Sequence, residues 1–330
     1  MSLELYPLAV GSIEADEPDL RLSSFRRRIA LSVLGALLVT GLLAFVLAGR
    51  AGQFSAALRT APTSLLAVAV LLQIVALLAR SEAWNVCVRA AGGTVGRRVL
   101  FRAAAVGSIA SVLNGSFGMA ARITSLRRAA PQTAPRVPAL MAAEVPIITV
   151  ELGLVAIFSF TLIAPLGVPW WVPVIIVGVA AGLVAVLLRV SKRHRTGLWA
   201  GLAILRIQGR GRLITFALLA VCAQVARNWL MLHAIGVNVS IFDAMALLIV
   251  MFTVGQLPIG PSTGPAAAVL ILGVHGVAAT AAAGVLVTVT GIVGSLGYAA
   301  WAITDRILGG RRDVSPEVGV PPVAVARAQA

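Results

Sequence analysis

The chain has 330 residues, of which 59% are hydrophobic and only 12% are charged, whereas about a quarter of the residues of a typical soluble domain are charged. This composition excludes an ordinary soluble domain, a disordered chain and a collagen-like chain, and it indicates a polytopic membrane protein. The net charge is +15, and all 27 basic residues except Lys192 are arginines. Beside a membrane such an excess sets the orientation of the spans, so we expect no nucleic-acid partner.

Apolar runs of about twenty residues predict six helices that cross the membrane. They lie near residues 29–48, 62–79, 138–164, 168–188, 213–235 and 282–303. The first run is too long for the apolar core of a signal peptide, and no small-residue cleavage site closes it, so we expect a retained span.

These runs divide the chain into three predicted parts. Residues 1–28 form a cytoplasmic N-terminal segment, and residues 29–305 form an all-α transmembrane domain with halves at about 29–165 and 168–305. Residues 306–330 are rich in Pro, Val and Ala without helical periodicity, which predicts a disordered cytoplasmic tail.

Two further apolar runs contain helix breakers where the middle of the bilayer would be. Residues 103–121 are interrupted at Asn114-Gly115-Ser116, and residues 244–280 are interrupted around Pro258 and Pro261. If both runs are re-entrant hairpins, 24 of the 27 basic residues lie on the cytoplasmic side. If residues 103–121 crossed fully, the external basic residues would rise from 2 to at least 13. The distribution of Arg therefore favours two re-entrant hairpins and cytoplasmic termini.

The order span, span, hairpin, span then occurs twice in opposite orientations. A pseudo-inverted repeat with interrupted helices near the midplane is typical of transporters, whose substrate site lies between the halves. The alternative is a coincidence among apolar segments of similar composition.

Two carboxylates lie in the predicted span 138–164. Glu144 and Glu151 are seven residues apart, which places them on one face of a helix. A carboxylate inside a membrane is expensive unless it is paired, so both are candidate substrate-binding residues. The alternative for Glu144 is an ion pair with a loop arginine such as Arg136.

Arg227 is the only basic residue within a predicted span, and Arg80 closes the corresponding segment of the first half. Guanidinium groups bind phosphate through two parallel hydrogen bonds, so this pair could receive a lipid headgroup. We expect Arg227 to be buried between the halves and paired with Glu151, Glu144 or a lipid phosphate. The alternative for Arg80 is that its side chain only extends to the headgroup layer.

The breaks themselves could bind an anion. Asn114, Ser262 and Thr263 lie where broken helix ends expose backbone N–H groups and the helix dipole favours negative charge. The glycines beside them could instead serve close helix packing alone. The histidines and the two cysteines lack ligand spacing, and enzyme motifs are absent from the sequence, so we expect no metal, no cofactor and no catalytic residues.

Four features together resemble a known family: Arg80-x-x-x-Trp84, the stretch from Asn114 to Arg122, a span that opens at Glu144, and the Pro258, Pro261 and Gly264 pattern. The chain resembles the transmembrane region of lysylphosphatidylglycerol synthase, also called the flippase-like family, over most of residues 30–305. Gly118 and Arg122 fit the family pattern, whereas Met119 stands where a glutamate is expected. The resemblance implies a multi-pass plasma-membrane protein that moves lipid between leaflets, with Arg122 among its site residues.

We therefore expect a protein of the bacterial plasma membrane that translocates or binds an anionic or polyprenyl-type lipid. The alternative is a partner subunit without transport activity that supports a separate cell-envelope glycosyltransferase or lipid synthase. A membrane-embedded transferase is a more distant third possibility.

Overall fold

The computed structural model describes residues 47–113, 115–193, 197–206, 210–254, 263–273 and 276–309, together with 37–38, 41–42 and 44–45. Within these residues every regular element is a helix, as the sequence predicts. The predicted segment 1–28, most of the first predicted span at 29–48, and residues 310–330 of the predicted tail lie outside this part of the chain.

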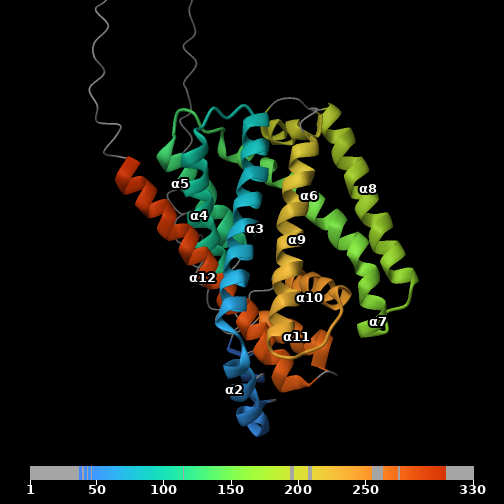
Figure 1. The fold of residues 1–330 in the computed structure, drawn as a ribbon. Coiled ribbons are helices and arrows are strands. Elements are labelled where there is room, and N and C mark those ends of the chain that lie inside the picture. The colour runs from blue at the N-terminus through green and yellow to red at the C-terminus, as the bar shows by residue number, and fades with distance from the viewer. Residues whose placement is uncertain are drawn as a thin grey trace, which may run out of the picture.

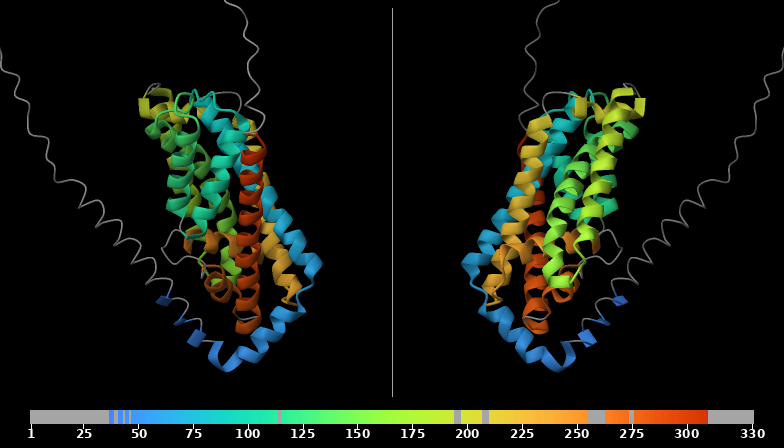
Figure 2. Two further views of the ribbon diagram at one scale, coloured as in Figure 1. Left: turned by 90° about the vertical axis from the view of Figure 1, so that its left-hand side faces the viewer. Right: turned by 90° about the vertical axis from the view of Figure 1, so that its right-hand side faces the viewer.

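Five helices are long and apolar enough to cross a membrane, which makes the chain a multi-pass membrane protein. They are α3 (Thr63–Ala90), α6 (Val137–Phe158), α8 (Trp171–Arg193), α9 (Arg210–Ala234) and α12 (Val277–Gly309). They confirm five of the six predicted spans. The 33 residues of α12 correspond to about 50 Å of helix, and α12 runs through most of the height of the bundle in both views of Figure 2.

Shorter helices connect and flank these five. They are η1 (Ala48–Arg50), α2 (Ala51–Thr60), α4 (Arg97–Leu113), α5 (Gly115–Ala129), η2 (Ser159–Leu162), α7 (Ile163–Leu166), η3 (Gly197–Arg206), α10 (Ile241–Val254) and α11 (Thr263–Leu272).

The bundle has two ends that differ in charge. Helix α3 runs from the end that carries α2 to the opposite end, and α9 returns beside it (Figure 1). The α2 end carries Arg50 and Arg59. We call the opposite end the basic end, because the neighbouring helix ends there carry Arg89, Arg97, Arg127, Arg128, Arg136, Lys192, Arg193, Arg210 and Arg306.

Helices α4 and α5 form an antiparallel hairpin whose open end lies at the basic end (Figure 1). Two glycines bring the backbones together: a Cβ on Gly107 would lie 2.8 Å from the Gly118 carbonyl oxygen, and a Cβ on Gly118 would lie 2.7 Å from Ser111 Cβ. The Thr94 amide donates to the Thr133 carbonyl at 3.3 Å and ties the flanking segments together. The break in the run 103–121 thus ends one helix and begins another that turns back.

Helices α10 and α11 pack on each other at the α2 end (Figure 1). Ser240 and Asp243 form a reciprocal cap at the start of α10, since each side chain accepts the backbone N–H of the other residue. At the start of α11, a Cβ on Gly264 would collide with Thr288 Oγ1 of α12. Gly264 therefore allows α11 to pack closely on α12. This is the alternative role given above for the glycines at the breaks.

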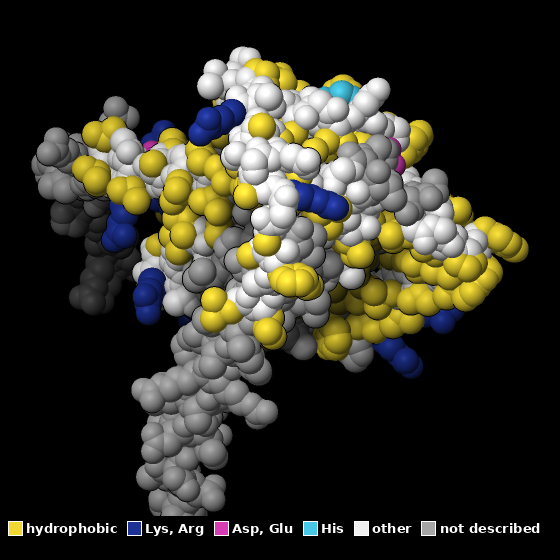
Figure 3. All heavy atoms as spheres, turned by 90° about the horizontal axis from the view of Figure 1, so that it is seen from below, with side chains coloured by type: hydrophobic (Ala, Val, Ile, Leu, Met, Phe, Trp, Pro, Cys, Tyr) yellow, Lys and Arg dark blue, Asp and Glu magenta, His cyan; other side chains and the backbone are white. Residues whose placement is uncertain are grey.

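The surface of the bundle is apolar. In the most apolar part of α8 only 6% of the residues are buried, so this helix presents Val174, Ile175, Val179 and Val186 outward. Seen from the α2 end, apolar side chains cover one flank of the molecule and charged groups are few (Figure 3). Such a surface suits contact with lipid.

The structure corrects two boundaries. Helix α3 continues to Ala90, so Arg80 lies inside the helix and not at its end. Residues 306–309, predicted to begin the disordered tail, belong to α12. Between the predicted spans 168–188 and 213–235, Gly197–Arg206 forms η3, which packs on α6 so closely that a Cβ on Gly201 would collide with the Ala139 carbonyl oxygen.

Candidate functional site

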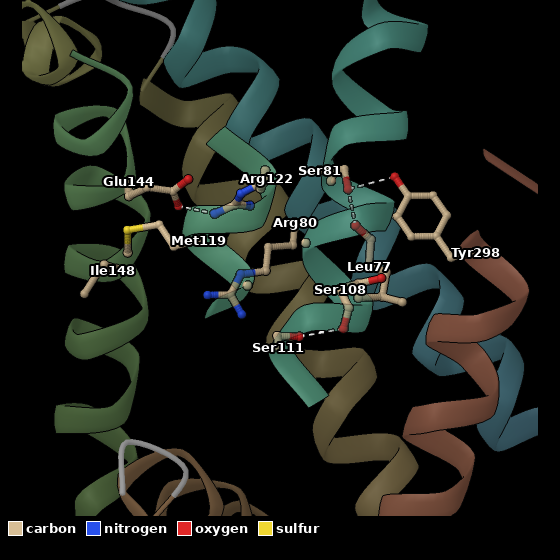
Figure 4. A pocket seen from close by; sticks show the side chains of 13 residues that line it. Leu77, Arg80, Ser81, Ser108, Ser111, Met119, Arg122, Glu144, Ile148 and Tyr298 are labelled. Atoms are coloured by element: carbon tan, nitrogen blue, oxygen red, sulfur yellow. Dashed lines mark hydrogen bonds and ion pairs between the residues drawn. The ribbon is translucent and has the colours of Figure 1, made fainter. Parts of the chain in front are cut away.

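A cavity of about 160 Å³ lies among α3, the α4–α5 hairpin, α6 and α12 (Figure 4). It is smaller than the roughly 300 Å³ at which pockets for drug-sized ligands begin, so it suits a compact headgroup and not a whole lipid. Its polar lining consists of Arg80, Ser81, Ser108, Ser111, Arg122, Glu144 and Tyr298.

Arg122 and Glu144 form a buried ion pair on one wall of the cavity. Arg122 Nη2 of α5 donates to Glu144 Oε2 of α6, and Figure 4 shows the two side chains pointing toward each other. The side chains are 12% and 4% exposed. The guanidinium also lies 4.5 Å from the centre of the Trp84 ring, so α3 holds the cation by a cation–π contact.

Arg80 and Glu151 form a second ion pair, which is more open. Arg80 Nη2 donates to Glu151 Oε2 at 3.1 Å, and the Arg80 side chain is 48% exposed whereas that of Glu151 is 12% exposed. The two acids are two turns apart on α6, as predicted from their spacing. Arg80 therefore stands at the accessible edge of the cavity, and Arg122 lies deeper.

The buried Arg122–Glu144 pair leaves two polar atoms of its members without a partner in the described part of the chain. Within the described residues, Arg122 Nε, Glu144 Oε1 and Trp84 Nε1 are buried without a hydrogen-bond partner. Buried polar atoms usually have partners, and orphaned ones point to a missing ion, water or ligand. The cavity thus offers one unused donor and one unused acceptor in its most buried pair.

Hydroxyl groups line the remaining wall. Ser81 Oγ lies 3.0 Å from Tyr298 Oη, which itself donates to the Phe101 carbonyl at 3.1 Å. Ser108 and Ser111 bond to carbonyls within α4, at Ala105 and Ser108. These bonds fix α3, α4 and α12 around the cavity.

Arg227 lies outside this cavity, and the prediction that it pairs with Glu144 or Glu151 is wrong. It is buried, as predicted, but its Nη1 donates to Gln73 Oε1 of α3, whereas Glu144 and Glu151 pair with the other two arginines. Arg227 is also not the only basic residue in a span, because Arg80 and Arg89 both belong to α3. A sequence cannot show which of several arginines reaches an acid on another helix.

The remaining predicted residues fall at the hairpin tips. Asn114 and Ser262 lie outside the described residues, and so does the Thr263 side chain, although Thr263 begins α11. The predicted position of the two breaks near the middle of the bilayer therefore concerns residues outside this part of the chain. The alternative pairing of Glu144 with Arg136 is wrong, because Glu144 pairs with Arg122.

Several residues around the three arginines escaped the sequence reading: Ser81, Ser108, Ser111 and Tyr298 line the cavity, Trp84 lies against Arg122, and Gln73 pairs with Arg227 outside the cavity. Trp84 is fully buried, and its ring lies against the Arg122 guanidinium. The spacing Arg80-x-x-x-Trp84 places both residues on one face of a helix, and this signal could have revealed a shared role. Tyr298 and Gln73 carried no comparable signal.

No family model, curated protein or solved structure matches this chain. The fold and the cavity define the class directly: a multi-pass helical membrane protein with two Arg–Glu ion pairs at a cavity inside its bundle.

Proposed function

We propose that this protein binds the headgroup of an anionic or polyprenyl-type lipid at the cavity and moves the lipid between the leaflets of the bacterial plasma membrane. The observation that carries the proposal is the presence of two arginines, Arg80 and Arg122, at a cavity inside a membrane domain. Arginine binds a phosphate through two parallel hydrogen bonds, whereas its present carboxylate partners each accept from one Nη atom.

The phosphate of the headgroup would replace Glu151 and Glu144 as the partner of the two arginines. A phosphate that enters past Arg80 can compete with Glu151 first and with Glu144 next, and the unused Arg122 Nε supplies a further donor. The apolar tails stay in the lipid because the cavity is too small for them. The Arg80–Glu151 and Arg122–Glu144 ion pairs thus close the path of the headgroup until a phosphate displaces the carboxylates.

The order of the helices supports a transporter. The series α3, α4–α5, α6 starts at the α2 end, and the series α9, α10–α11, α12 starts at the basic end (Figure 1). Interrupted helices in two oppositely oriented halves are typical of secondary transporters. The basic end would face the cytoplasm, because loop arginines accumulate on that side.

The test is a leaflet-selective assay with the full chain reconstituted in vesicles that contain a fluorescent phosphatidylglycerol. We expect translocation by the natural chain and at least a tenfold slower initial rate for Arg122→Gln, because the variant loses the buried cation. The matched control is Arg128→Gln, which changes an exposed arginine on the same helix.

A natural chain that binds the lipid but does not move it would favour the alternative, a partner subunit of a cell-envelope glycosyltransferase or lipid synthase. Equal rates for Arg122→Gln and Arg128→Gln would contradict the proposed site.

A further inference from the structure

The core of the bundle contains a second polar cluster, formed by Gln73, Gln224 and Arg227, and the buried Asn228 follows Arg227 on α9. Gln73 Oε1 of α3 accepts from Arg227 Nη1 and, at 3.1 Å, from Gln224 Nε2, both on α9. Arg227 is 5% exposed and Asn228 is fully buried. In the described part of the chain, Arg227 Nε and both polar atoms of the Asn228 side chain have no hydrogen-bond partner.

Arg227 has no carboxylate available to it between residues 37 and 309. That stretch contains five acids, and each of them is engaged elsewhere. Glu82 contacts Arg97, Glu144 contacts Arg122, Glu151 contacts Arg80, Asp305 contacts Arg102, and Asp243 caps α10. Among the described residues, the neutral Gln73 is thus the only side chain seen to accept a hydrogen bond from Arg227.

The cluster continues from the cavity toward the α2 end. Gln73 precedes Arg80 by seven residues on α3, which is two turns or about 10 Å along the axis. Leu77, one turn from each, lines the cavity. On α12, Tyr298 lines the cavity and Gly294, one turn before it, contacts Gln73.

Glycines on α12 make room for this cluster. A Cβ on Gly294 would lie 2.5 Å from Gln73 Cγ, and a Cβ on Gly291 would lie 3.3 Å from Arg227 Nη1. The aliphatic stem of Gln73 and the guanidinium of Arg227 therefore lie where side chains at Gly294 and Gly291 would otherwise be.

We infer that Arg227 forms a second anion-binding station, beyond the cavity and toward the α2 end, at which a phosphate group binds the Arg227 guanidinium. A buried guanidinium without a counter-charge is expensive and persists only with a partner or a function. The unpaired Arg227 Nε is a donor that an anion can use. The phosphate belongs either to a lipid headgroup or to free phosphate.

The station extends the proposed lipid path, but it rests on the Arg227 cluster and not on the cavity. Isothermal titration calorimetry of the purified full chain in a neutral detergent tests it, with dihexanoyl phosphatidate in one arm and inorganic phosphate in the other. We expect two phosphatidate molecules per natural chain, one per Arg227→Gln chain, and one per Arg122→Gln chain. Arg128→Gln should still bind two.

Arg227→Lys provides a second variant that keeps the charge. We expect this variant to bind two phosphatidate molecules, one of them with an affinity at least tenfold weaker than in the natural chain. The reason is that an ammonium group lacks the planar fork of arginine. A purely structural arginine would instead lower the unfolding temperature in the absence of ligand when changed to glutamine, without altering the stoichiometry.

The two arms identify the source of the phosphate. Loss of inorganic phosphate binding in Arg227→Gln supports a station for the free ion, and binding of phosphatidate alone supports a station for lipid. Two bound molecules in Arg227→Gln would overturn the second station. An unchanged stoichiometry in Arg122→Gln, with one molecule lost in Arg227→Gln, would overturn the cavity site and leave the station standing.

Discussion

Burial distinguishes the two ion pairs at the cavity. Arg122 and Glu144 lie deep in the bundle, where removal of one partner strands a charge that is largely shielded from water. Arg80 is half exposed, so solvent and headgroups can compensate a loss of Glu151. The same substitution should therefore have different consequences at the two acids of α6.

We expect Glu144→Gln to lower the free energy of unfolding by about 3–5 kcal/mol, because it leaves Arg122 as an unpaired buried cation. Glu151→Gln, the matched control two turns away, should change it by at most about 1 kcal/mol. Denaturation of the purified protein in detergent, followed by intrinsic fluorescence, measures both. Equal losses in the two variants would contradict the difference in burial.

Close contact between backbones holds the α4–α5 hairpin together. Gly107 and Gly118 face each other across the hairpin, and neither has space for a methyl group. Small residues let membrane helices approach so that packing replaces the hydrophobic effect, which is weak between helices in lipid. The hairpin positions Arg122, so its geometry affects the cavity directly.

Gly118→Ala should destabilise the protein by about 1–3 kcal/mol, because the new methyl group would collide with Ser111 and force α4 and α5 apart. Gly178→Ala on α8 is the matched control: a Cβ there meets nothing within 4 Å, and alanine is the better helix former. Thermal unfolding in detergent compares the two. A control as destabilised as Gly118→Ala would show that crowding at the hairpin is not the cause.

At the scale of the whole molecule, the uneven distribution of arginine predicts the orientation in the membrane. The basic end should face the cytoplasm, and the α2 end should face outward. The N-terminal segment and the tail should then both be cytoplasmic.

Labelling with a membrane-impermeant maleimide in intact cells tests this orientation. In a Cys222→Ser background, where the other cysteine, Cys87, is buried, we expect labelling of Arg59→Cys on α2 and none of Arg193→Cys at the end of α8 until the cells are opened. Strong labelling of Arg193→Cys from outside would invert the topology.

Local patterns in the sequence were sufficient to predict the spans. Apolar runs long enough to cross a bilayer located α3, α6, α8, α9 and α12, because a helix in lipid must bond its own backbone and needs a fixed length. The breaker at Asn114 predicted where one run divides into α4 and α5. The spacing of Glu144 and Glu151 correctly placed both acids on one face of α6.

The choice of partners was decided only by the tertiary structure. Arg227 was predicted to meet a glutamate, but α3 brings Arg80 to Glu151 and α5 brings Arg122 to Glu144, which leaves Arg227 with Gln73. These contacts join residues 22 to 154 positions apart. Hydropathy and helical spacing describe each helix separately, whereas ion pairs between helices depend on how far each helix is rotated and shifted against its neighbours.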